Sequence, residues 1–325
     1  GGPGSLRRCE AQHPLMSRLW GDKRYHSLDW EMKRTFGEKV YKLALNGGMT
    51  CPNRDGRLGT GGCIFCSEGG SGDFAASSLL PVSEQIEEAK KTIRQKTDCR
   101  KFIAYFQAYT NTYAPADVLR AKFTEAISHP DIAVLSIATR SDCFSPEIYA
   151  LLAELNTRKP VWVELGYQSM HSLSHRWMRT GFDLKSFTDC VNTLSRLGIR
   201  VIAHVILGLP TESRADMLAS VRYLASLPLW GVKLQMLHIL KGTALDTQYR
   251  EHPFPLLTME EYASLVVECL ELLPEDMVIH RLTGDGPRAS LTAPLWTLHK
   301  KQVLNTIAKQ QKRMDSYQGK EVENG

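Results

Sequence analysis

Short apolar runs alternate with amphipathic segments along most of the chain. The apolar runs are nearly continuous, which is typical of strands covered on both faces. They predict strands at residues 40–45, 102–106, 132–138, 161–165, 200–207 and 231–239. The segments between them predict helices at residues 82–96, 115–128, 146–155, 184–197 and 214–227. This alternation predicts an α/β fold with a parallel sheet and helices outside it.

Six such β units allow two arrangements. They can close partly, as three quarters of a (β/α)8 barrel, or lie in a doubly wound open sheet. In either arrangement, functional residues gather at the carboxyl ends of the strands. Polar stretches do follow the predicted strands here, at residues 46–66, 107–112, 139–142, 166–169 and 208–210. We therefore expect these stretches to build one site.

The pattern changes near residue 250, where Pro253 and Pro255 interrupt the chain. A helix at 259–273, a strand at 278–282, a glycine-rich turn at 283–287 and a helix at 295–314 are predicted after that point. We expect an N-terminal arm at 1–34, a core at 35–250 and a C-terminal α+β extension at 251–325. Residues 1–5 look like a cloning remnant.

The amino-acid composition is that of a globular protein with reduced cysteines. The chain has 325 residues, of which 43% are hydrophobic, so it can form a sizeable core. Its eight cysteines have no regular spacing and no signal peptide is visible, which predicts reduced thiols and a cytoplasmic location. No apolar run approaches the roughly 18 residues of a membrane span. The net charge of +5 permits nucleic-acid binding without requiring it.

Three cysteines lie close together, Cys51, Cys63 and Cys66, and glycines crowd the stretch before the CxxC pair. Three thiolates can hold three irons of a [4Fe–4S] cluster and leave the fourth iron open to a small molecule. An open iron suggests an S-adenosylmethionine (SAM) radical enzyme, since electron-transfer proteins normally fill all four positions. CxxC is also typical of zinc sites, which need a fourth ligand. Cys99 and Cys143 are isolated candidates for that ligand, so zinc remains an alternative.

Several sequence blocks together resemble the radical SAM enzymes, and among them the YhcC/YtqA-like subfamily. That subfamily is related to the catalytic subunit of elongator and to coproporphyrinogen dehydrogenase. The eleven residues between Cys51 and Cys63 exceed the commonest radical SAM spacing but fit this subfamily. The blocks span about residues 35–295 and are LNGGMTCPNRDG (45–56), GGCIFC (61–66), YFQAYT (105–110), TRSDC (139–143), ELGYQS (164–169), HVILGLP (204–210) and LHILKGT (237–243).

The resemblance implies a partial (β/α)6 TIM-like barrel that binds a [4Fe–4S] cluster and SAM. It implies that Cys51, Cys63 and Cys66 ligate the cluster. An electron from the cluster would cleave SAM and release a 5′-deoxyadenosyl radical, while the protein positions the reactants and excludes water. A flavodoxin or ferredoxin-type protein would donate the electron.

The resemblance also implies which residues contact SAM. The 107–112 stretch replaces the family's glycine-containing motif that meets the SAM amino group. Gln168 and Arg179 match positions that hold the ribose and carboxylate, and His204 stands where relatives often carry Asp. Gln168 could instead cap a helix, Arg179 could be a surface charge, and His204 could be a core histidine. The expected SAM contacts are Gln107, Asn111, Thr139, Arg140, Gln168, Arg179 and His204.

The resemblance further suggests tRNA as substrate. MnmL-type members of the subfamily convert 5-carboxymethylaminomethyluridine at the wobble position to 5-aminomethyluridine. In the last predicted helix, Lys301, Lys309, Lys312 and Arg313 fall opposite Trp296, Val303, Leu304 and Ile307. Near the N-terminus, basic residues interleave with Tyr25, namely Arg18, Lys23, Arg24, Lys33 and Arg34. Such faces can follow phosphates or simply be solvated.

Three hypotheses therefore stand. The chain is a radical SAM enzyme that modifies tRNA, a radical SAM enzyme on a small metabolite or another macromolecule, or a zinc-stabilised nucleic-acid-binding module without catalysis.

Overall fold

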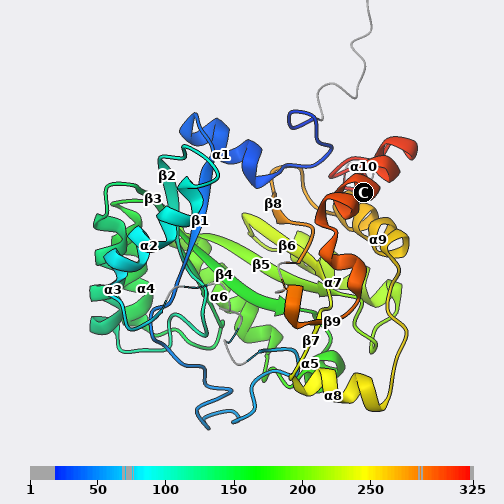
Figure 1. The fold of residues 1–325 in the computed structure, drawn as a ribbon, viewed down its shortest axis with the longest axis horizontal. Helices are drawn as coiled ribbons and strands as arrows, with labels where there is room; N and C mark the ends of the chain where they lie inside the picture. Colours follow the sequence, from blue (N-terminus) through cyan, green and yellow to red (C-terminus); the bar gives the residue numbers. More distant parts are fainter. Residues whose placement is uncertain are drawn as a thin grey trace, which may run out of the picture.

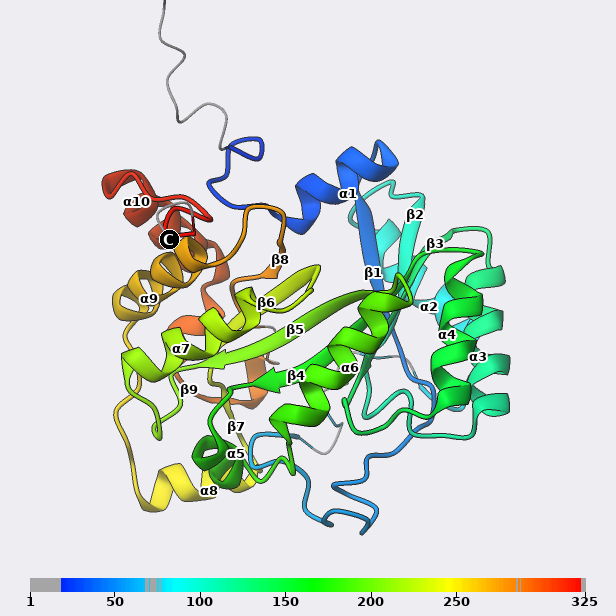
Figure 2. The same ribbon diagram turned by 180° about the vertical axis from the view of Figure 1, so that it is seen from behind.

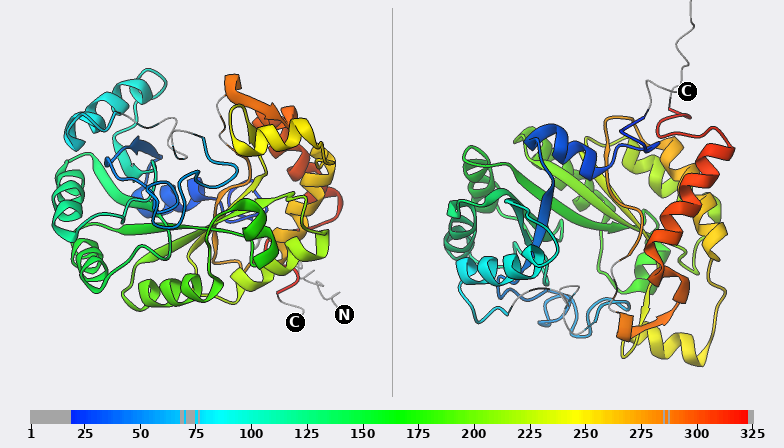
Figure 3. Two further views of the ribbon diagram at one scale, coloured as in Figure 1. Left: turned by 90° about the horizontal axis from the view of Figure 1, so that it is seen from below. Right: turned by 45° about the horizontal axis from the view of Figure 1, so that its top comes forward.

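The computed structural model describes residues 19–67, 70, 75, 77–284, 286 and 288–322. A parallel seven-stranded sheet runs through it in the order β1-β2-β3-β4-β5-β6-β8. The sheet is curled and the helices lie outside it, which confirms the partial barrel (Figure 3). The strands are β1 (Val40–Leu45), β2 (Lys101–Phe106), β3 (Ile132–Thr139), β4 (Val161–Gln168), β5 (Arg200–Leu207), β6 (Gly231–Met236) and β8 (Val278–Arg281).

Helices follow most strands, as the periodicity predicts (Figure 1). Their starts carry the expected caps: the Ser145 side chain accepts from Ile148 N ahead of Pro146, and Ser213 and Asp216 form a capping box. The helices are α1 (Leu28–Phe36), α2 (Val82–Arg94), α3 (Ala116–Ser128), α4 (Pro146–Asn156), α5 (Ser172–Met178), α6 (Leu184–Arg196), α7 (Arg214–Ala225), α8 (Ala244–Glu251), α9 (Met259–Leu272) and α10 (Lys300–Arg313).

The C-terminal segment contributes to the main sheet. Strand β8 pairs in parallel with β6, with Ile279 opposite Val232, so the sheet has one strand more than the six predicted units. The predicted strand at 231–239 is too long, because β6 ends at Met236. The chain then turns into β7 (Ile239–Leu240), which pairs antiparallel with β9 (Leu291–Ala293). Tertiary pairing between distant residues decides both differences.

The predicted N-terminal arm contains helix α1. Ser27 caps its start by accepting from Trp30 N, and Gly37 ends it in the left-handed conformation at a φ of 74°. Helix α1 lies near the amino end of β1 (Figure 2). Met32 of α1 packs with Trp162 and Ile202 in a buried apolar cluster. This apolar cluster closes one end of the barrel and leaves the carboxyl ends of the strands for a site.

In the part of the chain that the structure describes, every helix is too short or too polar to cross a bilayer.

Candidate active site

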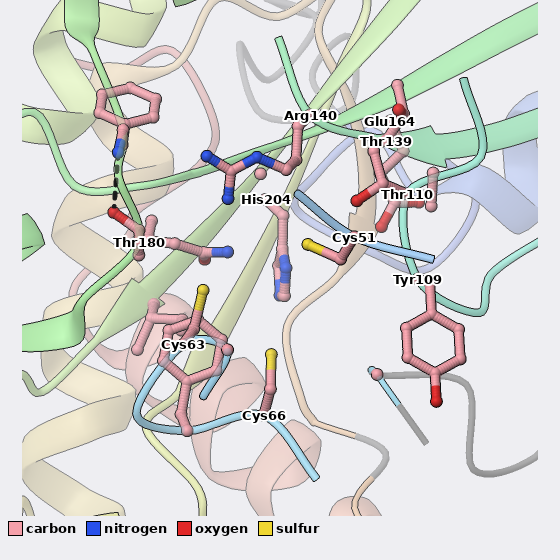
Figure 4. Close-up of a pocket in the computed structure, with 18 of the residues that line it drawn as sticks. Cys51, Cys63, Cys66, Tyr109, Thr110, Thr139, Arg140, Glu164, Thr180 and His204 are labelled. Atoms are coloured by element: carbon pink, nitrogen blue, oxygen red, sulfur yellow. Dashed lines mark hydrogen bonds between the residues drawn. The ribbon is translucent and has the colours of Figure 1, made fainter. Parts of the chain in front are cut away.

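The three cysteines of the loop after β1 line one cavity at the carboxyl ends of the strands. The cavity encloses about 290 Å³, and the sulfurs of Cys51, Cys63 and Cys66 face its common space (Figure 4). Two contacts fasten the loop to the end of α5. Ile64 N donates to Met178 O at 2.9 Å, and Asn53 Nδ2 donates to Arg179 O at 2.7 Å. The loop is thus positioned by the barrel.

The surroundings of the sulfurs suit thiolates that share a positive partner. Interaction with Cys66 and then burial raise the pKa of Cys63 well above its ordinary value, while Arg140 and Asn53 act in the opposite direction. Asn53 Nδ2 lies 3.5 Å from Cys63 Sγ, and Arg140 binds Asp142 at 3.0 Å. Since hydrogen bonds and nearby charge tune Fe–S clusters, these side chains fit a bound cluster.

The three sulfurs surround a shared cavity, which suits a group larger than a single metal ion. Neither candidate for a fourth zinc ligand lines it: Cys99 lies before β2 with its Sγ 3.1 Å from Lys101 O, and the Cys143 thiol contacts Asp142 Oδ1 at 3.4 Å.

Five of the seven predicted SAM contacts line the same cavity: Gln107, Thr139, Arg140, Gln168 and His204. Two of them carry unused polar atoms. Gln168 Oε1 and His204 Nε2 are buried and have no hydrogen-bond partner among the described residues. A buried polar atom without a partner is costly, so these atoms favour a ligand that hydrogen-bonds to them.

A local irregularity directs Gln168. The pairing of β4 with β5 shifts register between Gly166 and Gln168, and Gln168 has a φ of 62°. A bulge of this kind re-aims a side chain at a strand end, and a left-handed conformation is unusual for a residue other than glycine. The nearby Tyr109 also has a positive φ, of 63°. Such strain gathers at functional sites.

The other two predicted SAM contacts do not line the cavity. Asn111 is fully buried, and its Nδ2 donates to Phe106 O at 3.0 Å and to Ala138 O at 2.9 Å, which ties the ends of β2 and β3 together. Arg179 ends α5 in the left-handed conformation, and its side chain is exposed. Asn111 Oδ1 is also buried without a hydrogen-bond partner among the described residues, and a SAM contact by either residue stays a prediction.

The strands themselves bear a second polar group, which the sequence reasoning largely missed. We call Tyr105, Glu164, Gln235 and Arg281 the floor of the cavity, since all four line it from β2, β4, β6 and β8. Glu164 Oε2 lies 2.6 Å from Lys233 Nζ and accepts from Tyr105 OH at 3.0 Å. The sequence does contain one sign of this group, a charged residue inside an otherwise apolar strand.

Opposite charges next to the floor stabilise one another. Although burial alone would raise it, the charges of Lys233 and Lys42 keep the pKa of Glu164 far below its ordinary value. Burial lowers the pKa of Lys233, and the charge of Glu164 opposes that effect. Burial also lowers the pKa of His204 to about 4, so its ring is neutral at neutral pH. Glu164 is therefore an ionised carboxylate inside the barrel.

Comparison with known proteins agrees with this geometry. The Radical SAM superfamily model matches residues 53–224, and the Radical_SAM C-terminal domain model matches residues 229–313. YtqA of Bacillus subtilis (strain 168) is 43% identical over 299 residues, which cover 92% of this chain and 93% of YtqA. YhcC of Escherichia coli (strain K12) is 33% identical, covering 82% of this chain and 85% of YhcC.

More distant similarities extend to a tRNA enzyme and to solved structures. A tRNA uridine(34) acetyltransferase of Dehalococcoides mccartyi (strain CBDB1) is 29% identical over 168 residues, which are 50% of this chain and 35% of that enzyme. The Elp3 structure of the archaeon Methanocaldococcus infernus shares the fold, with a TM-score of 0.60 at 15% identity, over 83% of this chain and 63% of that one. Members of the matched superfamily normally bind a [4Fe–4S] cluster and SAM. The chain belongs to the radical SAM superfamily.

Proposed function

We propose that this protein uses a [4Fe–4S] cluster and SAM to modify the wobble uridine of tRNA. The reaction is the conversion of 5-carboxymethylaminomethyluridine to 5-aminomethyluridine. Membership of the radical SAM superfamily supports the chemistry, and the cysteine-lined cavity supports its location. The similarity to a tRNA uridine(34) acetyltransferase over half of this chain is the observation that carries the choice of substrate.

The residues of the cavity have different roles in this reaction. Cys51, Cys63 and Cys66 would hold the cluster, which when reduced would supply the electron for the cleavage of SAM into methionine and a 5′-deoxyadenosyl radical. Gln168 and His204 offer buried polar atoms to SAM or substrate. The barrel walls exclude water, which would otherwise intercept reactive species.

The substrate offers a weak C–H bond next to nitrogen. Its glycine-like methylene loses a hydrogen atom, then an electron and a proton, and becomes an imine. Once the imine has left the cavity, water hydrolyses it and releases glyoxylate, which leaves the amine on the uridine. The methylene carbon is thereby oxidised by two electrons: one would leave with the hydrogen atom taken by the 5′-deoxyadenosyl radical, and the second would return to the oxidised cluster, so that one SAM is converted to methionine and 5′-deoxyadenosine. Absence of glyoxylate among the products contradicts this route.

Helix α10 supports contact with RNA. Lys301, Lys309, Lys312 and Arg313 are exposed on it, while Val303 and Ile307 are buried. Leu304 was predicted to lie on the apolar side, but it is 37% exposed. A helix face of this charge can follow phosphates and should make binding sensitive to salt.

The N-terminal basic residues support RNA binding less well. Lys33 pairs with Asp29 at 2.8 Å, and Arg34 pairs with Glu31 at 2.6 Å. Arg24 binds Asp315 at 3.1 Å. Arg18 lies outside the described residues. Because carboxylates already neutralise most of this group, we place the RNA contact on α10.

Nucleoside mass spectrometry of tRNA from a deletion strain tests the proposal. We expect 5-carboxymethylaminomethyl-type uridines to accumulate on deletion. The wild-type gene should reverse the accumulation and a Cys63→Ala gene should not, whereas Cys99→Ala should behave as wild type. An unchanged nucleoside profile contradicts the tRNA substrate.

A small metabolite is the second candidate substrate. SAM cleavage that tRNA does not affect, together with no retention of the protein on tRNA, would favour this candidate.

A further inference from the structure

We propose that His175 is a positioning residue that holds a strained turn at Gln168 and so sets the affinity for SAM, without touching SAM itself. His175 belongs to α5, is buried and lines the cavity. The inference rests on the SAM-binding part of the proposed function. It does not depend on tRNA as the substrate.

Both ring nitrogens of His175 are already bonded within the protein. Its Nε2 lies 2.6 Å from Ser169 O, and its Nδ1 lies 2.6 Å from Thr180 Oγ1. Two other histidines that line the cavity, His204 and His238, differ, because the Nε2 atom of each has no partner in the described part of the chain. His175 has no ring nitrogen left for a ligand, which favours a positioning role over a direct contact.

The partners of His175 fix the tautomer of its ring. A carbonyl oxygen can only accept, so Nε2 carries the proton and donates to Ser169 O. Nδ1 then accepts from the hydroxyl of Thr180, whose oxygen accepts in turn from Phe182 N at 3.2 Å. Burial lowers the pKa of His175 to about 4, so the ring is neutral at neutral pH and keeps this pattern.

The bond to Ser169 O supports a strained three-residue turn. Ser169 N donates to Tyr167 O at 2.7 Å across Gln168, whose φ is 62°. A three-residue turn with a positive φ at its central residue is rare and strained. Such strain persists only where the surroundings hold it in place. His175 supplies that hold, because it binds the carbonyl immediately after the turn.

A second support holds the same segment from α7. Ser220 Oγ accepts from Met170 N at 3.1 Å, and Ser220 O accepts from Tyr167 OH at 2.9 Å. These bonds fasten the segment to α7, whereas the carbonyl of Ser169 is bound by His175. Loss of the His175 bond should therefore release the strained turn locally, without detaching the segment from α7.

The other side of His175 reaches the turn that fastens the cysteine loop. Thr180 follows Arg179, whose carbonyl accepts from Asn53 Nδ2 at 2.7 Å. The ring of His175 also stacks on Phe182, with ring centres 4.1 Å apart. One buried side chain thus joins the turn beside the cysteine loop to the strained turn at the end of β4.

The test measures SAM affinity by anaerobic calorimetry on the holoenzyme, with each value corrected for iron content. In His175→Gln the side-chain amide can still donate to Ser169 O, whereas in His175→Asn it is too short. We expect His175→Asn to weaken SAM binding about tenfold and His175→Gln to stay within about twofold of the wild type. Rescue by the glutamine is the result that a merely space-filling role of the ring would not give.

His26 provides a matched control, because it is a buried histidine whose two ring nitrogens are also bonded. Its Nδ1 lies 2.9 Å from Glu275 O, and its Nε2 lies 2.8 Å from Glu31 Oε2. His26→Asn should lower the free energy of unfolding and leave the SAM affinity unchanged. An equal loss of SAM affinity in His26→Asn and His175→Asn would assign both losses to general instability and overturn the proposal.

A double-mutant cycle asks whether His175 acts through Gln168. Gln168→Ala alone should weaken SAM binding, and the addition of His175→Asn should weaken it by no more than about twofold further. The same tenfold loss from His175→Asn in both backgrounds overturns the proposal. Unchanged SAM affinity in His175→Asn also overturns it, even if the wild type modifies tRNA. A loss confined to the background that retains Gln168 supports the proposal, even if the tRNA assay fails.

Thr180 provides a milder variant. If His175→Asn does not assemble the cluster, Thr180→Val replaces it. This change removes the hydroxyl that donates to Nδ1 of His175, so the ring proton can move to Nδ1 and the bond to Ser169 O is then lost. SAM binding should weaken several-fold in Thr180→Val but not in Thr180→Ser, which keeps the hydroxyl. Undiminished binding in Thr180→Val contradicts the proposed role of His175.

Discussion

The two faces of the curled sheet are both covered, yet they carry different chemistry. Neighbouring residues show the contrast: Val163 packs under the helices, whereas Glu164 lines the cavity. In β6, Leu234 joins the outer core, whereas Lys233 pairs with Glu164 of the floor. Side chains alternate along a strand, so each strand builds the fold with one face and the site with the other.

The two faces differ in what their burial contributes to stability. The outer face consists of well-packed apolar side chains, such as Phe102 and Leu135 at 0% exposure. The inner face buries a lysine–glutamate pair, which apolar residues of similar volume could replace at little or no loss of stability. A charged layer inside an otherwise apolar barrel is therefore best explained by ligand binding.

The largest effect should come from the cysteine loop. Cys63→Ala should abolish both iron binding at full stoichiometry and the formation of 5′-deoxyadenosine, because two remaining thiolates hold a cluster poorly. Iron and sulfide analysis after anaerobic purification, followed by SAM-cleavage assays, measures this. Cys99→Ala is the matched control at the other end of the strands, and full iron content in Cys63→Ala contradicts the assignment.

The next largest effect should come from the inner face. Glu164→Ala leaves Lys233 and Lys42 buried without their carboxylate and should reduce the free energy of unfolding by about 3–5 kcal/mol. The double variant Glu164→Gln with Lys233→Met should recover most of that loss. Denaturant titration measures both. A double variant no more stable than Glu164→Ala means that the pair is needed for folding.

On the outer face, Leu135→Ala should cost about 2–5 kcal/mol of unfolding free energy through the cavity that it leaves. It should nevertheless leave the affinity for SAM unchanged. Thermal unfolding and calorimetry on the same preparation separate the two effects. A loss of SAM affinity larger than partial unfolding explains would contradict the division between the two faces.

The smallest effect should lie outside the barrel, at α1. Burial would raise the pKa of Glu31, but hydrogen bonds and charges from Arg34 and His26 lower it below its ordinary 4.5. A lowered carboxyl pKa stabilises the fold above pH 4.5, and that contribution disappears as the pH falls through the folded value. Glu31→Gln should lose about 1–2 kcal/mol at pH 7 and less at pH 4. Equal losses at both values contradict the ion pair.

Local patterns predict much of the fold. Continuous apolar runs give the strands, and caps such as Ser145-Pro146 give helix starts. The cysteine loop can be recognised from the sequence because its three cysteines lie within a stretch of sixteen residues. Helix α1 was missed although Ser27 and Gly37 mark its ends, so that omission was avoidable.

Pairings between distant residues could not be predicted. Strand β8 joins β6 across more than forty residues, and Glu164 meets Lys233 across 69. Periodicity does not encode such partners. The side-chain direction at a strand end is equally hidden: Gln107 and Asn111 lie in one turn, yet only Gln107 of the two lines the cavity. The bulge that aims Gln168 depends on pairing with β5.

Deuterium transfer tests the central claim most directly. A tRNA anticodon stem-loop carrying 5-carboxymethylaminomethyluridine, deuterated at the glycine-like methylene, is incubated with reduced holoenzyme and SAM. We predict 5′-deoxyadenosine that carries deuterium, together with 5-aminomethyluridine in the RNA. Unlabelled 5′-deoxyadenosine and an unchanged nucleoside would contradict the proposal that this cavity acts on the wobble uridine.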